Sequence, residues 1–467
     1  MINNPSSICA AMITQWKLPE TLFGDTPAMR AASTTYLPQR SKESDAAYDV
    51  RLNETTLVNY LTPAIESLSG KVFSKEIVVG ENLKPYQDWL DNIDMEGSNI
   101  NEFGKELFVA SALRGVTYIV VDAPFAVKAD NLKDQKNSNV RPYLVHVTAN
   151  QIIGFKTRII NNVKTLSEVR ISETIIETDE DYNEVEKERV RKLFIPESGG
   201  RAGWEIHEPV NTDKGIEWVK TEEGLFSVDY ITIIPYYTNK QGFMQARTYF
   251  TTLCYINLQH WNSSSYQRNI LNTARVPRLT GFGFGEDEIK EFEKHGVANG
   301  VFSTNKDATA GWMECEGKSI GHGERDLKSM EEQMALLSLD PILKKETTTD
   351  LATVANIESS KSNSVIEQWA GSLQAALIDA IVIMGELANR KIDKPDIKVN
   401  DEYQLIDNSA VSMKELREQR GAGDLSRRTL LTEAKRIGFY DDDFDVDTEI
   451  SLIKAEENDE DEGFNES

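Results

Sequence analysis

Glycine-rich stretches are the first places where this sequence could bind phosphate. The stretch GFGFG occupies residues 281–285, but a dinucleotide-binding loop needs GxGxxG between a strand and a helix, and the spacing fails after Gly285. The stretch GKS at residues 317–319 resembles the end of an ATP-binding P-loop, whose opening glycine would stand at position 312, where this chain has Trp312. The glycines therefore predict neither a nucleotide site nor an ATPase.

Metal-binding and nucleophilic residues are few and widely spaced. The chain has five histidines with no HxxxH or HExxH pair, and three cysteines with no CxxC. The acidic run from Glu177 to Asp181 lacks the spacing and the central glycine of an EF-hand. We therefore predict no disulfide framework, no metal site, no cofactor and no catalytic residue, while groups that only the fold brings together stay open. The residues considered are His146, His207, His260, His295, His322, Cys9, Cys254 and Cys315.

A polar segment in the second half of the chain combines lysines with small hydroxyl side chains. Residues 344–363 read KKETTTDLATVANIESSKSN and contain no aromatic residue. This composition predicts a loop between two helices, and it leaves two interpretations open: an ordinary exposed connection, or a loop whose cations contact a polyanion. The candidate contact residues are Lys344, Lys345, Thr347, Thr348, Thr349 and Lys361.

Composition and charge limit the class of protein. Of the 467 residues 40% are hydrophobic, which is enough for two or three domains with a sizeable core. The 51 Lys and Arg residues stand against 76 Asp and Glu, a formal net charge of −25, so the surface should repel nucleic acid and a DNA-coating role is excluded. We find no run of about twenty apolar residues and no signal peptide, and we expect a reduced, cytoplasmic setting without a membrane.

The first half of the chain predicts an irregular arm, then helices, then a sheet. Four prolines in the first forty residues favour a peripheral extension over residues 1–43 rather than a helix. From Ser44 to Gly70 the pattern is that of a long helix or a kinked pair, and another helix should run from about Asn99 to Gly115. The apolar run 116–124 predicts a strand. Short β-like stretches in residues 143–232 predict an antiparallel sheet decorated by polar insertions such as EVEKERV.

The second half predicts long helices around a small glycine-rich module. Residues 243–276 contain no Pro or Gly and predict a helix of up to 34 residues, and a second helix should span 326–340. Between them, residues 278–325 predict a module with a short helix at 286–294. Apolar residues at spacings of three and four predict a long amphipathic helix, with Ile366, Trp369, Leu373, Leu377, Ile381 and Met384 on its packing face.

The C-terminal part predicts a broken helical segment and an acidic tail. Residues 408–439 are helical in pattern and interrupted by GAGD at 421–424, with Ser426 and Thr432 as possible caps. Residues 441–467 hold thirteen acidic residues and one lysine, which favours a solvated, disordered tail.

Four motifs, in this order, resemble the portal proteins of tailed bacteriophages, the head-to-tail connectors. YDVRLNETTLVNYLTPAIESLSGKVFSK resembles the start of the portal wing, and RPYLVHVTANQIIGF resembles a wing strand that follows a loop. LQHWNSSSYQRNILNTARVPRLTGFG is similar to the first stem helix running into the clip, and TVANIESSKSNSVIEQWAGSLQAAL is similar to the tunnel loop and tunnel helix.

The resemblance implies a portal-like α+β fold with a fixed order of parts. The chain would comprise an N-terminal arm (1–43), a β-rich wing (44–242), a first stem helix (243–276), a clip (277–325), a second stem helix (326–340), a tunnel loop and helix (341–391), a return to the wing (392–407), a helical crown (408–440) and a disordered acidic tail (441–467).

The resemblance also implies a function and partners. Such chains form a ring, usually a dodecamer, at one capsid vertex of the virion, assembled in the host cytoplasm, and double-stranded DNA passes through it in packaging and ejection. The partners would be a terminase large subunit, the major capsid protein and a head-tail adaptor protein, and the chain would not be an enzyme. The six lysines and threonines named above would face the DNA channel. Two alternatives stay open: an acidic adaptor or scaffold protein without a DNA channel, and a carboxylate-based hydrolase.

Overall fold

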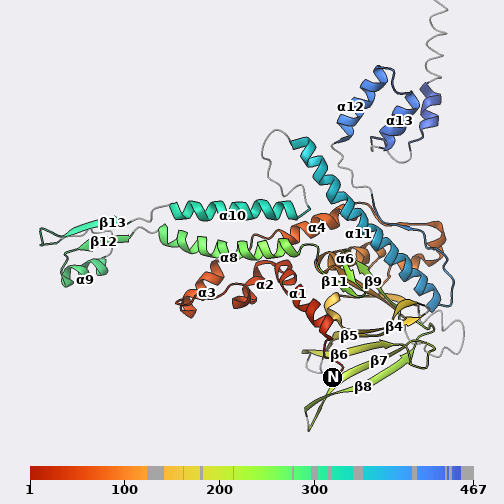
Figure 1. Cartoon of the computed structure of the whole chain (residues 1–467), viewed down its shortest axis with the longest axis horizontal. Coiled ribbons are helices and arrows are strands. Elements are labelled where there is room, and N and C mark those ends of the chain that lie inside the picture. Colours follow the sequence, from red (N-terminus) through yellow and green to blue (C-terminus); the bar gives the residue numbers. More distant parts are fainter. Residues whose placement is uncertain are drawn as a thin grey trace, which may run out of the picture. The chain divides into compact units, whose positions relative to one another are not determined.

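Residues 1–401 fold around two antiparallel sheets, and residues 402–467 form a second unit of helices (Figure 1). The computed structural model describes residues 1–123, 141–160, 162–178, 182–213, 215–275, 278–295, 303–313, 318–339, 351–401, 408–436, 439–440 and 444–453. The mixture of helix and antiparallel sheet agrees with the predicted α+β class.

The smaller of the two sheets lies inside the protein. Its central strand β2 (Val116–Asp122) pairs antiparallel with β3 (Tyr143–Val147) and with β9 (Ile233–Tyr237). The continuous apolar run of β2 fits this position, because a strand covered on both faces needs no polar alternation. On one face α6 (Ile100–Arg114) and α11 (Leu351–Leu387) pack against β2, and α11 also packs against β9.

The larger sheet is a five-stranded antiparallel meander in sequence order. The predicted antiparallel sheet is confirmed. The prediction that EVEKERV is a polar insertion is wrong, because these residues form the start of β6, and every residue of β6 pairs with β5. The five strands are β4 Ile152–Ile160, β5 Val163–Thr178, β6 Glu184–Phe194, β7 Gly203–Thr212 and β8 Gly215–Leu225.

The N-terminal residues are helical and form part of the core. The prediction of an irregular arm is wrong for α1 (Ser7–Phe23) and α2 (Asp25–Ala31). Cys9, Met12 and Trp16 of α1 are buried together with residues of β2, β5 and β7. This burial explains why α1 continues through Pro19, since the apolar contacts offset the roughly 3 kcal/mol that a proline costs inside a helix.

The predicted helix at residues 44–70 is a pair. It consists of α3 (Asp45–Glu54) and α4 (Leu61–Val72), with Ser44 capping α3 by accepting a hydrogen bond from the amide of Ala47. Pro63 lies in the first turn of α4, where a missing amide hydrogen is tolerated, so it does not bend a continuous helix. The next predicted helix is confirmed as α6, with the capping box of Asn99 and Glu102 at its start and Gly115 at φ 92° at its end.

The helical second half differs from the prediction at the ends of its helices. The first long helix, α8, spans Thr251–Ala274, 24 residues instead of 34, because residues before it form the hairpin of β10 (Lys240–Gly242) and β11 (Gln245–Ala246). The helix α10 spans Lys318–Leu337 and starts eight residues earlier than expected. Helix α11 starts at Leu351, so the predicted loop is helical from that residue on.

Between α8 and α10 lies a small module of two strands and one helix. Strands β12 (Arg278–Phe282) and β13 (Thr309–Met313) pair antiparallel, and α9 (Glu286–His295) confirms the predicted short helix. The remaining short elements of this unit are η1 Ser33–Thr35, β1 Val78–Val79, η2 Glu81–Tyr86, α5 Gln87–Leu90, η3 Ala149–Gln151 and β14 Ile397–Lys398, of which β1 and β14 pair with each other.

Part of α11 is long and apolar enough to cross a membrane by length and composition. The stretch Ser362–Leu387 has a mean hydropathy of 1.5. We did not detect it in the sequence, because polar residues interrupt the run of apolar residues. The apolar side chains on its packing face, however, are buried within the protein, where α11 packs against β2 and β9. We therefore interpret it as a core helix.

The second unit contains α12 (Asn408–Gly421) and α13 (Arg427–Arg436), separated at the predicted GAGD. Ser426 accepts a hydrogen bond from the amide of Thr429, as expected for a cap, whereas the hydroxyl of Thr432 donates to the carbonyl of Arg428 inside α13. The prediction of a disordered tail from 441 onwards is wrong for residues 444–453. Four of their side chains pack against the core of α12 and α13: Phe444, Val446, Ile450 and Ile453.

Candidate functional site

The paired helices α8 and α10 run antiparallel and side by side. The side-chain amide of Gln267 in α8 donates to the carbonyl of Ile320 in α10 at 3.0 Å, and at the other end His260 lies 3.4 Å from Glu331. At 1.5 Å per residue the two helices are about 36 and 30 Å long. Strands β12 and β13 pair with each other at the far ends of α8 and α10. The helices α8 and α10 and the small module therefore extend together away from the two sheets.

His260 is a buried histidine between these two helices. Only 2% of its surface is exposed, and burial lowers its pKa, although the nearby carboxylates of Glu331 and Asp326 oppose this shift. The imidazole is therefore neutral at pH 7. Its ion-pair partner among the described residues is Glu331, and the histidine serves to pack α8 against α10.

Polar side chains on α8 hold the segment that precedes α4. Asn257 accepts from the amide of Tyr60 at 3.1 Å and donates to the carbonyl of Val58 at 2.8 Å. Ser265, which the sequence motif singles out, accepts a hydrogen bond of 3.1 Å from Arg51 of α3. These contacts make α8 the element onto which the N-terminal helices dock.

Arg51 is the centre of this attachment. Its guanidinium lies 2.6 Å from Glu43 and also donates to the carbonyl of Pro38 at 3.0 Å. Arg51 is 5% exposed, and its hydrogen bond to Glu43 lowers the pKa of that carboxyl from 4.5 to about 2. A buried, fully bonded ion pair of this kind positions segments and carries no reactive group.

The amphipathic helix α11 packs by the face that its sequence predicts. The residues expected on the packing face are all buried: Ile366, Trp369, Leu373, Leu377, Ile381 and Met384. Trp369 meets the rings of Phe108, Tyr249 and Phe250 at centroid distances of 6.0, 5.7 and 6.2 Å, and its carbonyl accepts a bond from the hydroxyl of Tyr236. This aromatic cluster fixes the start of α8 against α11.

The residues expected to contact a polyanion are placed only in part. Lys344, Lys345, Thr347, Thr348 and Thr349 lie outside the described residues. Lys361 lies in α11, not in a loop, and its side chain is outside the description. Their role stays a prediction.

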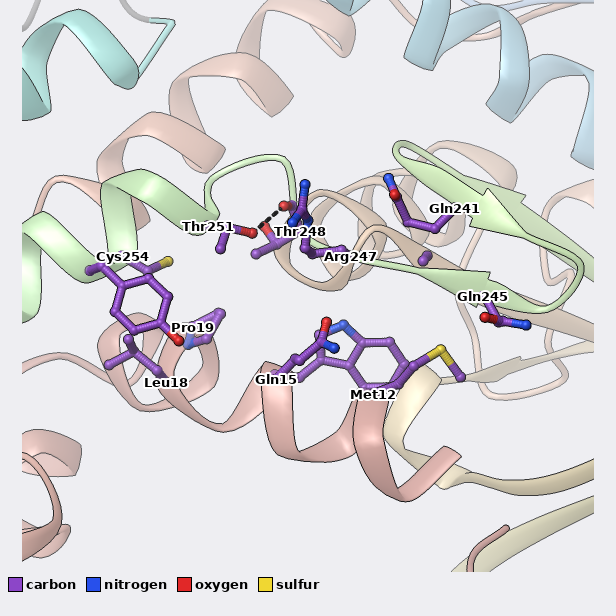
Figure 2. A pocket seen from close by; sticks show the side chains of 13 residues that line it. Met12, Gln15, Leu18, Pro19, Gln241, Gln245, Arg247, Thr248, Thr251 and Cys254 are labelled. Atoms are coloured by element: carbon purple, nitrogen blue, oxygen red, sulfur yellow. Dashed lines mark hydrogen bonds between the residues drawn. The ribbon is translucent and has the colours of Figure 1, made fainter. Parts of the chain in front are cut away.

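A cavity of about 460 Å³ lies between α1, the β10–β11 hairpin and the start of α8. Figure 2 shows Met12 and Gln15 of α1 on one side, Gln241 and Gln245 of the hairpin on another, and Thr251 donating to the carbonyl of Thr248. Arg247 is the charged residue among the lining side chains, and burial raises the pKa of Cys254 to about 12. The lining thus lacks the paired acid and base, or the activated thiol, that hydrolysis requires.

Two other histidines considered in the sequence analysis each lie next to a carboxylate. His146 lies 2.6 Å from Glu106, and His207 lies 3.2 Å from Glu205. Among the described residues, no group of three or more His, Cys, Asp or Glu side chains is arranged to hold a metal ion. In the stretch GFGFG, the first two residues end β12 and Gly283 turns the chain at φ 81°.

Sequence reasoning missed the buried attachments of the N-terminal segment. Trp16 and Arg51 lie far in sequence from the residues that they contact, and both hold the N-terminal segment in place through tertiary contacts. For Trp16 a signal was present, since Cys9, Met12 and Trp16 follow helical spacing. For Arg51 no local pattern marks its partner, because Ser265 is 214 residues away.

Comparison with known proteins gives a family profile and several solved structures. The profile, described as a domain of unknown function (DUF4055), matches residues 250–387, which run from α8 to the end of α11. No curated protein matches the chain.

Three of the matching solved structures come from gene transfer agent particles. A chain of the virion of the native particle is 10% identical with a TM-score of 0.41, covering 80% of this chain and 89% of that chain. A chain of the native neck, computed with C12 symmetry, is 12% identical with a TM-score of 0.42, covering 87% and 98%. A chain of the empty-particle neck, computed with C6 symmetry, gives 10%, 0.40, 81% and 89%.

Proposed function

We propose that this chain is the portal protein of a tailed phage or phage-like particle. It would form a ring, usually of twelve subunits, at one capsid vertex of the virion, and double-stranded DNA would pass through the ring during packaging and ejection. The observation that carries the proposal is the order of parts: an α/β body, the excursion of α8, the β12–α9–β13 module and α10, and then the long core helix α11. This order matches the wing, stem, clip and tunnel helix that the sequence motifs suggest.

Exposed apolar side chains on α8 support assembly with further copies. Tyr255, Tyr266 and Ile270 are 64, 47 and 39% exposed and stand within about 60° of one another around the helix. Leu336 of α10 is 57% exposed. A pair of helices this long, with apolar residues left uncovered, gains stability when neighbouring subunits cover them.

The charge of the chain is compatible with a conduit. With a net charge of −25, an acidic ring wall would repel phosphates, so DNA would be held centrally without being bound tightly. Lys344, Lys345, Lys361 and the neighbouring threonines would add a weak, salt-screened contact at a constriction. Translocation would be driven by the ATPase of the terminase large subunit, so the portal itself needs no catalytic residue.

The parts map onto elements as follows in this proposal. The wing would contain the two sheets, the stem would be α8 and α10, the clip would be the β12–α9–β13 module, and the crown would be the unit of α12 and α13. Partners would be the terminase large subunit, the major capsid protein and a head-tail adaptor. Assembly would take place in the host cytoplasm.

Electron microscopy and light scattering of the purified protein test the proposal. A closed ring with a central channel and a mass many times 52.6 kDa is expected. Changing Tyr255 and Ile270 together to Glu should prevent ring formation, whereas the matched changes of Ile159 and Val163, at 75 and 59% exposure on the β4–β5 hairpin, should not. A stable monomer at micromolar concentration under all ionic conditions would contradict the portal function and favour an adaptor without a channel.

A further inference from the structure

Residues 408–436 carry a charge opposite to that of the whole chain. They contain seven Lys and Arg against four Asp and Glu, a net charge of +3, whereas the chain has −25. Shortly after them, residues 441–449 contain six acidic residues and no basic one. The second unit therefore joins a cationic pair of helices to an anionic segment.

Cations of α13 lie on or at the edge of the face that points away from the small core. Leu430, Leu431 and Ala434 are buried against Met413 of α12. With 3.6 residues per turn, the opposite face is the outer one. Thr432 and Arg436 lie on it, and Arg428 and the half-buried Lys435 lie along one edge of it, next to Leu431.

The acidic segment packs its apolar side chains on the core and reaches the edge of this outer face with its polar groups. Asp447 is 3.0 Å from the guanidinium of Arg428, and Lys435 donates to the carbonyl of Phe444 at 2.8 Å. The hydroxyl of Thr448, the amide of Asp447 and the charge of Lys435 keep the pKa of Asp445 below its ordinary value. The carboxylates of Asp445 and Asp447 thus lie close to the two cations Lys435 and Arg428.

The carboxylates of the acidic segment are easy to displace from these cations, although apolar contacts hold the segment itself in place. Arg428 and Asp447 are 68 and 69% exposed, and exposed ion pairs are weak and screened by salt. A DNA duplex presents one phosphate charge per about 1.7 Å of its axis, which is a much denser array of anions. Phe444, Ile450 and Ile453 pack against the core, so the segment would stay attached while its carboxylates exchange for phosphates.

We propose that the outer face of α13 binds the phosphates of double-stranded DNA, and that Asp445 and Asp447 compete with DNA for Arg428 and Lys435. The inference rests on the proposed function in one respect, since packaged duplex DNA is the polyanion that a portal meets. It adds a second DNA contact, separate from Lys344, Lys345 and Lys361, that the acidic segment keeps weak. Arg436 contributes less, because it pairs with Glu433 at 2.7 Å.

The test uses the full chain and a closed circular duplex without ends, in filter binding at several salt concentrations. Changing Asp445 and Asp447 to Asn keeps a capping side chain at position 445, so the helical residues 446–453 should survive. Unpairing Arg428 and removing the carboxylate charge near Lys435 should steepen the slope of log affinity against log salt by about one to two and raise affinity about tenfold at low salt. Adding R428Q and K435Q to this variant should return binding to the level of the unchanged protein.

The matched control changes Glu217 and Glu222 of β8 to Gln, which alters the net charge equally at two exposed sites. It should leave binding unchanged. Equal gains in the control and in D445N/D447N, or no gain in D445N/D447N, would overturn the inference. Circular DNA cannot thread a channel, so this result is independent of ring formation. Rings without a gain would refute only the inference, and a gain without rings would refute only the portal function.

Discussion

At the scale of single residues, Arg51 shows how this fold places a charge inside. Its hydrogen-bond partners are Glu43, the carbonyl of Pro38 and Ser265, so one guanidinium joins two parts of the N-terminal segment to α8. The fork of five donors suits this role, because each partner approaches from a different side. A lysine could not satisfy all three partners in the same geometry.

The first prediction concerns this ion pair. Changing Arg51 to Ala should lower the free energy of unfolding by about 3 kcal/mol, because the carboxylate of Glu43, 8% exposed, would be left buried without its cation. The double change R51M/E43Q removes both charges and should be less destabilising than R51A alone. Thermal denaturation of the three proteins measures the order. A double variant less stable than R51A would mean that the cost of losing Arg51 does not come from an unpaired Glu43 carboxylate.

The same pair makes stability depend on pH. The pKa of Glu43 is about 2 in the folded chain and 4.5 as the ordinary value, so the unfolded chain takes up the proton first as the pH falls. The stabilisation is therefore present above about pH 5 and is lost between about pH 5 and pH 2. R51M/E43Q should lose less stability than the unchanged protein over this range.

At the scale of elements, the sequence predicted a helix or strand well where residues next to it in sequence determine its ends. Asn99 and Gly115 mark the ends of α6, and the apolar run after Gly115 gives β2, because caps and burial act within a few residues. The start of α8 could not be read locally. Residues 240–246 pair as a hairpin, and Thr248 donates to the carbonyl of Ala112, so tertiary contacts override the helical pattern there.

Long-range pairing also explains the strands that the pattern missed. The start of β6 is almost wholly charged, and it becomes a strand because β5 supplies partners as far as Thr178. Strand β8 is exposed along most of its length and pairs only with β7. For the candidate site, the packing face of α11 followed from periodicity, whereas the attachment of α3 to Ser265 did not.

The second prediction tests whether the N-terminal helices belong to the core. Changing Trp16, 1% exposed, to Ala should lower the free energy of unfolding by about 3 to 5 kcal/mol, because it removes a large side chain from between the two sheets. Changing Ile8, 43% exposed on the same helix, to Ala should cost less than about 0.5 kcal/mol. Similarly small losses of unfolding free energy in both variants would indicate that residues 1–43 form a peripheral arm, as the sequence predicted.

The third prediction separates the two parts of the acidic C-terminal stretch. Removing residues 454–467, in which Phe464 is the one large apolar residue, should leave the second unit intact. Removing residues 441–467 should destabilise it, because Phe444, Ile450 and Ile453 would no longer cover Leu430 and Leu431. Limited trypsin digestion reports the difference through cleavage within α13. Equal resistance of both truncated proteins would show that the helix after Asp445 contributes nothing.

At the scale of the whole molecule, charge is distributed unevenly along the chain. The net charge of −25 includes −12 from residues 441–467, so the remaining residues carry −13. In a ring each of these values is multiplied by the number of subunits, and each lysine becomes a band of positive charge. A contact too weak to matter in one chain can therefore act on a duplex at the ring axis, within a Debye length of roughly 8 to 10 Å.

The last prediction uses this multiplication. Changing Lys344 and Lys345 together to Glu should leave ring assembly unchanged, because a polar segment adds little packing, and should reduce the number of DNA-filled heads in a complementation assay. The matched control changes Lys391 and Lys394, both exposed in the segment after α11, to Glu, and filling should stay normal. Normal filling by the Lys344 and Lys345 variant would mean that these lysines do not meet DNA. Reduced filling by both variants would trace the effect to added negative charge in general, since the two changes are equal in charge and differ only in place.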